Sequence, residues 1–230
     1  MSGMEGTRIV MVRHGESMAQ ERRIVGGHAG CTGLSERGRT QVAALRDRLV
    51  RTGELGDDVV LYASLMPRAI ETAEILAPAL GGPPVLRDCD LCENHPGEGD
   101  GITWDEFEAR YPYPEGAWDP DHRRVPGGET WNEMKVRVGR GVDGLVERHP
   151  GRTVVVATHG GPIVQVMIRF LAIDPSADEK RAWFAPENAS ITEFRHAVNP
   201  YQRTTLDWEM VRFNDHAHIS GNGSEAAPKV

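Results

Sequence analysis

The chain has 230 residues, a hydrophobic fraction of 39% and a net charge of −8 at pH 7, which are typical of a globular protein with one sizeable core. The negative charge opposes binding to a polyanion, so we expect no nucleic-acid partner. No run approaches the roughly 20 apolar residues of a membrane span. The first residues lack the basic segment and apolar core of a secretory signal, so we expect a cytoplasmic protein.

Short runs of branched apolar residues alternate with helical patterns along the chain. The strand runs are 8–12, 58–63 and 153–157, and the helical patterns are 35–51, 67–80, 128–148 and 161–172. Continuous apolar runs are typical of strands covered on both faces. The alternation therefore predicts an α/β fold, a three-layer sandwich with a mainly parallel central sheet and helices on both faces.

Two later runs, 190–195 and 204–213, predict further strands that are antiparallel at one edge of the sheet. An open edge strand there would allow a homodimer.

Residues 88–129 are rich in Gly, Pro, acids and aromatics, with one short helical patch at 103–111. We interpret them as a lid insertion over the carboxyl edge of the strands. Residues 1–218 would then form a single catalytic domain, and residues 219–230 a disordered tail.

Polar residues follow three of the predicted strands or lie just beyond them. They are Arg13-His14-Gly15, the stretch from Ser64 to Arg68, and Thr158-His159-Gly160. Ligands of open α/β sheets bind outside the carboxyl ends of the strands. Arginine forks match phosphate oxygens, and a helix that begins near Gly160 would add N–H donors. The sequence therefore predicts a phosphate site at this edge.

Four stretches in this order resemble the histidine phosphatase superfamily, which includes phosphoglycerate mutases and small-molecule phosphatases. They are VRHGES, SLMPRAIETA, LCENHPGEGDG and ATHGG. The similarity spans roughly residues 8–213. A lone RHG would carry little weight, whereas the four motifs together are specific.

The resemblance implies that His14 is the nucleophile and becomes a phosphohistidine. Arg13, Arg68 and His159 would bind the phosphoryl oxygens, and Glu93 would be the general acid and then the base. His14 must be neutral to attack, and nearby cations disfavour its protonated form. We expect no cofactor and no metal, because the cationic groups would stabilise the transferred phosphoryl group.

Other residues near these motifs are weaker candidates for the site. Gln20 and Gly27 fall where relatives bring a side-chain amide and backbone to the phosphate, although Gln20 is equally compatible with a solvated loop. Asn94 and His95 lie beside Glu93, where they could contact the leaving group. His28 and His122 could also reach the site, but ordinary loop positions are the stronger expectation.

Cys89 and Cys92 have the C-x-x-C spacing of metal and redox sites. A tetrahedral zinc site needs two more ligands, and the sequence has no second C-x-x-C or H-x3-H pair. We therefore expect two half-buried thiols near a strand end and no metal.

The insertion distinguishes a phosphatase from a mutase. A mutase needs a longer, basic insertion, whereas only 35 residues separate Glu93 from Glu129 (129 − 93 − 1). The segment 88–129 holds twelve acids against three bases, Arg110, Arg123 and Arg124. This balance favours a phosphatase acting on a monophosphate with a neutral, hydroxylated or cationic body, such as a sugar or nucleoside.

Several alternatives remain open at this stage. Arg123 and Arg124 would hold a substrate carboxylate or pair with neighbouring acids. The aromatics of the insertion would stack on substrate or pack the insertion onto the core; they are Trp104, Tyr111, Tyr113 and Trp118. The alternative functions are a phosphoglycerate mutase and a catalytically silent binder of a phosphorylated ligand.

Overall fold

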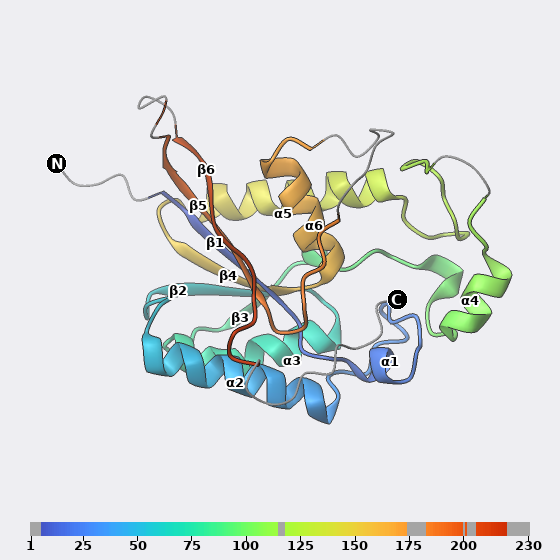
Figure 1. Ribbon diagram of the computed structural model, residues 1–230, viewed down its shortest axis with the longest axis horizontal. Helices are drawn as coiled ribbons and strands as arrows, with labels where there is room; N and C mark the ends of the chain where they lie inside the picture. Colours follow the sequence, from blue (N-terminus) through green and yellow to red (C-terminus); the bar gives the residue numbers. More distant parts are fainter. Residues whose placement is uncertain (1–5, 115–117, 174–182, 200, 202–205, 220–230) are drawn as a thin grey trace.

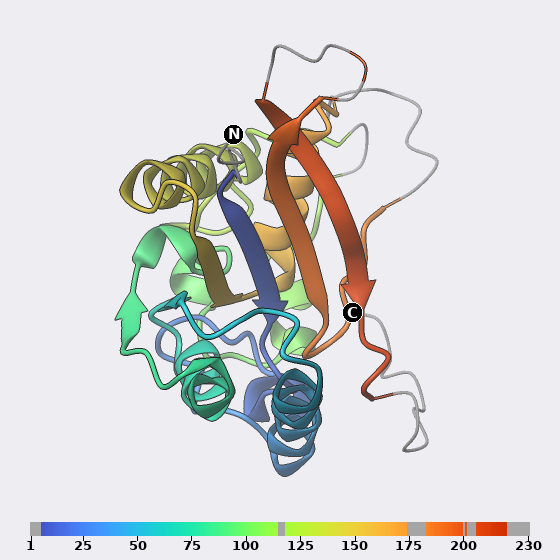
Figure 2. The same cartoon turned by 90° about the vertical axis from the view of Figure 1, so that its left-hand side faces the viewer.

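The computed structural model describes residues 6–114, 118–173, 183–199, 201 and 206–219. Its centre is a six-stranded sheet in the order β3-β2-β4-β1-β5-β6. The strands are β1 (Arg8–Arg13), β2 (Val59–Ala63), β3 (Val85–Arg87), β4 (Thr153–Thr158), β5 (Ile191–Val198) and β6 (Leu206–Asp215). The first four are parallel to one another, while β5 and β6 form an antiparallel edge. This arrangement confirms the predicted, mainly parallel sheet (Figure 2).

Helices cover both faces of the sheet (Figure 1). The α-helices are α1 (Met18–Glu21), α2 (Glu36–Thr52), α3 (Pro67–Leu76), α4 (Trp104–Arg110), α5 (Trp131–Arg148) and α6 (Gly160–Phe170), and the 3₁₀ helices are η1 (Ala77–Leu80), η2 (Cys89–Leu91) and η3 (Gly97–Gly99). Helices α2 and α3 pack on one face, and α5 and α6 pack on the other. The α/β sandwich is therefore confirmed.

The alternation of side chains along β1 explains the two cores. Val10 and Val12 point into the core under α2 and α3, whereas Ile9 and Met11 point into the core under α5 and α6. All four are fully buried, because successive side chains of a strand point to opposite faces and both faces are covered. A continuous apolar run was the signal for this arrangement.

Local capping sets the beginnings of the two longest helices. Ser35 accepts a hydrogen bond from the Gly38 amide at the start of α2. Thr130 and Glu133 form a reciprocal capping box at the start of α5. Helix α5 therefore begins at Trp131, three residues later than the sequence pattern predicted.

The segment 88–129 packs against the loop that follows α1. Val25 from that loop joins Phe107 of α4 and Val125 in a small apolar cluster. Trp104 and Tyr111 pack at its margin, so these two aromatics hold the segment together. Helix α4 lies at one end of the molecule, beyond the end of the sheet (Figure 1).

Two short elements were not predicted from the sequence, helix α1 and strand β3. Elements of four and three residues leave almost no periodic pattern. Ile219, the first residue of the expected tail, packs against the core beside α2 and α3; residues 220–230 lie outside the described residues. Within the described ranges, no helix has the length and apolar character needed to cross a bilayer.

Candidate active site

The carboxyl ends of β1, β2 and β4 lie side by side and bring the predicted motifs together. The amide of His14 donates to the carbonyl of Thr158 at 2.9 Å, and the amide of Ser64 donates to the carbonyl of Ala157 at 3.1 Å. The parallel ladder therefore continues one residue past β1 and one residue past β2. These backbone hydrogen bonds place the motifs around His14, Ser64 and Thr158 next to one another.

The His14 ring is buried and held in one tautomer. Only 4% of the residue is exposed, and its Nδ1 lies 2.6 Å from the carbonyl oxygen of Gly15. Because a carbonyl oxygen only accepts hydrogen bonds, Nδ1 must carry the proton. In a neutral ring the lone pair is then on Nε2, the nitrogen that faces the interior of the site.

The Arg68 side chain lies between the two histidines. Its Nε donates to His14 Nε2 at 3.0 Å and to His159 Nδ1 at 3.1 Å. The remaining nitrogen of the His159 ring, Nε2, lies 2.7 Å from the hydroxyl of Ser64. Arg68 is itself anchored by a 2.6 Å hydrogen bond from Nη1 to the carbonyl of Gly26. Residues from three motifs thus form one hydrogen-bonded unit.

The surroundings of both histidines favour the neutral form. Burial, followed by the positive charge of Arg68, lowers the pKa of His14 well below its ordinary value, and Arg13 adds to the effect. The same two leading causes lower the pKa of the fully buried His159. A neutral His14 is required for nucleophilic attack.

The Arg13 guanidinium has a buried donor, Nε, that is not used within the described part of the chain. Its Nη1 donates to the carbonyl of Pro186, but among the described residues its Nε has no hydrogen-bond partner. Burial lowers the pKa of Arg13, while Glu93 and Glu187 act in the opposite direction. An orphaned, buried cationic donor favours an anionic ligand, and phosphate fits the planar fork.

The Glu93 carboxylate lies at the beginning of α6. Its Oε2 accepts from the amide of Gly161 at 3.2 Å, and its Oε1 accepts from the amide of Asn94 at 3.0 Å. Residue 161 must be glycine for this contact, since a Cβ there would overlap Oε1. The structure thus brings Glu93 to the same sheet edge as the histidines.

Comparison with known proteins identifies the family. The model of the histidine phosphatase superfamily (branch 1) matches residues 9–214. The chain belongs to the histidine phosphatase superfamily.

Curated relatives of this histidine phosphatase include enzymes of known activity. It is 31% identical to the metal-independent phosphoserine phosphatase of Arabidopsis thaliana, over 95% of this chain and 86% of that protein. It is 30% identical to the glucosyl-3-phosphoglycerate phosphatase of Mycobacterium tuberculosis, over 95% of this chain and 99% of that protein. Other relatives are longer, and the chain spans 44% of a bifunctional protein of Mycobacterium tuberculosis.

A solved structure supports the same family. The mycobacterial glucosyl-3-phosphoglycerate phosphatase in complex with VO3 superposes with a TM-score of 0.71 at 27% identity, covering 90% of this chain and 99% of that one. Together with the curated relatives, this match supports a phosphatase enzyme.

Sequence reasoning missed the residue that holds the Glu93 loop of this histidine phosphatase. Arg137, on α5, is 8% exposed. Its Nη2 donates to the carbonyl of Glu93 at 3.1 Å, and its Nη1 donates to the carbonyls of Cys89, Asp90 and Cys92 at 2.9–3.1 Å. Glu129 balances its charge through two hydrogen bonds of 2.6 and 2.7 Å. A lone arginine in an amphipathic helix gives no signal of this role.

The weaker candidates are engaged in local structure. The exposed Gln20 accepts from the amide of Ser17 at 3.0 Å in the cap of α1, and its Nε2 lies 3.5 Å from Asn188 Oδ1. The amide of Gly27 donates to Asp100 at 2.9 Å. Gly160 begins α6, where an added Cβ would approach Arg13 Nε at 3.8 Å.

The two adjacent arginines of the insertion pair with groups of the insertion or of α5 beside it. Arg123 contacts Glu133 and the carbonyl of Gly128. Arg124 contacts Glu108 and stacks over Tyr113 at 4.1 Å.

The other groups of the insertion also lie within it or beside it. Trp118 packs against Trp131, and the side-chain amide of Asn94 donates from Nδ2 to the carbonyl of Glu129. His122 is exposed, while His28 and His95 approach the two cysteines and not the Arg68 unit.

Proposed function

We propose that this histidine phosphatase hydrolyses a small-molecule phosphate monoester through a phosphohistidine on His14, with Glu93 as general acid and base. The observation that carries the proposal is the His14 ring. Its Nδ1 proton is fixed on the Gly15 carbonyl and its Nε2 lies 3.0 Å from the Arg68 guanidinium. This arrangement supports a neutral nucleophile beside a permanent positive charge.

In the first step, Arg68 Nε transfers its hydrogen bond from His14 Nε2 to a phosphoryl oxygen, and the freed lone pair of Nε2 forms a bond to phosphorus while the ester P–O bond breaks. The leaving oxygen takes a proton from the carboxylic acid of Glu93. Arg13 and Arg68 supply the positive charge that stabilises the equatorial oxygens, a task that metal ions perform in kinases and GTPases. The incoming phosphate also favours the protonated form of His159, since an opposite charge raises a histidine pKa.

In the second step, a water oxygen attacks the phosphorus and gives its proton to the Glu93 carboxylate. The P–N bond breaks, and its electron pair returns to His14 Nε2. Inorganic phosphate leaves, and both groups regain their starting protonation states. Dividing one displacement into two steps is the advantage of covalent catalysis.

The pairing of Arg123 and Arg124 supports a substrate body without a second anionic group. Several acids of the segment 88–129 are already neutralised by arginines of α5, including Asp90 by Arg140 and Asp88 by Arg148. Because Arg123 and Arg124 pair within or beside the insertion, neither supports a second anionic group on the substrate. A phosphorylated sugar, nucleoside or amino-containing metabolite fits these charges better than a bisphosphate.

The test compares Glu93→Gln with the wild-type enzyme on two ester classes. An alkyl phosphate has a poor leaving group that needs a proton, whereas an activated aryl phosphate does not. We expect kcat/KM to fall by about 100-fold or more for the alkyl ester and far less for the aryl ester. Equal losses would remove Glu93 from the proposed role. Interconversion of 2- and 3-phosphoglycerate that depends on a bisphosphate primer would favour the mutase instead.

A further inference from the structure

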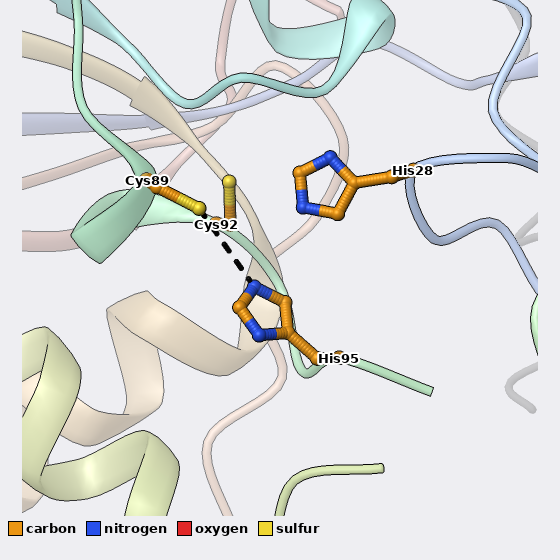
Figure 3. Close-up of side chains that lie close together, drawn as sticks. All are labelled: His28, Cys89, Cys92 and His95. Atoms are coloured by element: carbon orange, nitrogen blue, oxygen red, sulfur yellow. Dashed lines mark hydrogen bonds between the residues drawn. The ribbon is translucent and has the colours of Figure 1, made fainter. Parts of the chain in front are cut away.

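We propose that His28, Cys89, Cys92 and His95 form a zinc site that fixes two loops beside the active site. The ligand atoms of the four side chains all lie within 4.8 Å of one another. Figure 3 shows the imidazole of His28 approaching from one loop toward the two sulfurs and the His95 ring of another. None of the four belongs to the hydrogen-bonded unit around Arg68 described above.

The distances suit a tetrahedral ion after small side-chain movements. Cys89 Sγ lies 3.9 Å from His95 Nε2, and the centroids of the His28 and His95 rings are 5.4 Å apart. Zinc bonds of about 2.3 Å to sulfur and about 2.0 Å to nitrogen place neighbouring ligand atoms about 3.3–3.8 Å apart. The four side chains are therefore close to the required spacing before any ion binds.

Three of the ligands come from one short segment with suitable spacing. Cys89, Cys92 and His95 are each separated by two residues, and the amide of Cys92 donates to the carbonyl of Cys89 at 3.0 Å in a tight turn. The amide of Leu65 donates to Cys92 Sγ at 3.4 Å. Such an N–H···S contact orients a ligand sulfur and would stabilise a thiolate.

The loop that carries His28 is built independently of the cysteines. The carboxylate of Asp100 accepts hydrogen bonds from the amides of Gly27, Ala29 and Gly30 at 2.8–2.9 Å. This clamp holds the backbone on both sides of His28 in place. The second ligand loop is held by Arg137 through four carbonyls. Both halves of the site are thus ordered by residues other than the ligands.

The ligand chemistry selects the ion. Two thiolates and two imidazoles form a common donor set of structural zinc, whereas magnesium and calcium prefer oxygen. Each thiol loses its proton as the ion binds, and the cation balances the two negative charges. A disulfide between the cysteines would leave the convergence of two imidazoles on them unexplained.

The position of the site suggests what the ion does. Gly26, two residues before His28, supplies the carbonyl that anchors Arg68. Glu93 lies between Cys92 and His95 in the chain and contacts the amide of Gly161. An ion that joins these two loops would hold the arginine anchor and the proton donor at a fixed separation without touching the phosphate.

The test measures metal binding by the purified 230-residue chain under reducing conditions. We expect one equivalent of zinc per chain, and cobalt substitution should give the absorption bands of tetrahedral thiolate coordination. The variants are Cys89→Ser and His28→Ala, and the latter removes an exposed side chain. The matched control is His122→Ala, another exposed histidine in a loop.

The expected result is loss of the thiolate bands in Cys89→Ser and a weakening of zinc affinity by about 100-fold or more in His28→Ala. Zinc should raise the melting temperature of the wild type and of His122→Ala, but not of His28→Ala. Two results would each overturn the proposal: no bound zinc at micromolar concentration, or equal zinc affinity in His28→Ala and the control. Hydrolysis is not a readout, so the outcome is independent of the proposed reaction.

Discussion

The carboxylate of Glu93 lies directly against the backbone of Gly161, with 3.2 Å between Oε2 and the amide nitrogen. The proton donor of the proposed reaction is therefore positioned by the second residue of α6. An added Cβ at residue 161 would overlap Glu93 Oε1 and also crowd Met134.

Gly161→Ala should therefore displace the Glu93 carboxylate. Misplacing a catalytic group by about 1 Å can cost on the order of 100-fold in rate, and we expect a loss of that size in kcat for alkyl phosphates. Aryl phosphates should be affected much less, because their leaving groups do not need the proton. Steady-state kinetics on both ester classes measure the difference.

The matched control is Gly144→Ala in α5. A Cβ there would meet only the flexible end of Arg148, at 3.5 Å. Alanine is favoured over glycine in a helix interior, so this variant should retain its activity and its stability. A Gly161→Ala enzyme with wild-type rates on alkyl esters would mean that the Glu93 contact does not matter for catalysis.

Arg137→Lys tests whether Arg137 positions the Glu93 loop. Lysine keeps the charge opposite Glu129 but cannot reach four carbonyls and a carboxylate at once. We expect a lower kcat for alkyl phosphates with a nearly unchanged KM. Arg140→Lys, one turn away and exposed, should alter stability by less than about 1 kcal/mol and leave the kinetics unchanged.

A more drastic change at the same position should destabilise the fold. Arg137→Met leaves the carboxylate of Glu129, whose side chain is 9% exposed, without its partner. Removing one member of a buried pair costs about 3–5 kcal/mol, which denaturant unfolding measures. For the lysine variant of the preceding prediction, a wild-type kcat on alkyl esters would exclude the role of Arg137 in positioning the Glu93 loop.

The neutral state of His14 predicts a specific pH dependence. Burial and the two arginines lower its pKa well below 6.5, so its ring nitrogens should show no protonation between pH 8 and pH 6 in an NMR titration of labelled histidine. The unfolded chain binds a proton near pH 6.5 and the folded chain does not. His14 and His159 therefore make the free energy of unfolding decrease as the pH falls below about 6.5.

Removing one cation should shift this titration. Arg13→Gln takes away a positive charge that disfavours the imidazolium, so the pKa of His14 should rise toward its ordinary value. The urea-unfolded protein supplies the reference titration. A wild-type His14 that titrates near 6.5 would be protonated in about half of the enzyme at that pH and would contradict a nucleophile that stays neutral.

The sequence predicted the parts of the site that depend on strand ends. Arg13 ends β1, and His14 and His159 directly follow the buried strands β1 and β4. Parallel strands bring their carboxyl ends to one edge. Arg68 could be assigned to the same edge of the sheet because its motif follows β2, another buried strand. The proximity of these residues could be predicted because local pattern and sheet geometry agree, whereas their catalytic roles stay predictions.

The parts that escaped prediction depend on contacts between distant segments. Arg137 becomes buried only because the loop around Glu93 folds over α5. His28 is far from Cys89 in the chain, so spacing alone gave no reason to join them. A count of acids in 88–129 likewise ignored that residues such as Asp90 are paired with arginines outside that segment.

The most direct test of the central claim is to trap the phosphoryl group on the protein. Glu93→Gln should accept phosphoryl from an activated aryl ester and release it slowly, since its base is missing. After an alkaline quench, mass spectrometry should find an acid-labile phosphate on the peptide that contains His14. The double variant His14→Ala/Glu93→Gln should carry no such phosphate. A phosphate that persists in the double variant, or that resides on His159, would contradict the account.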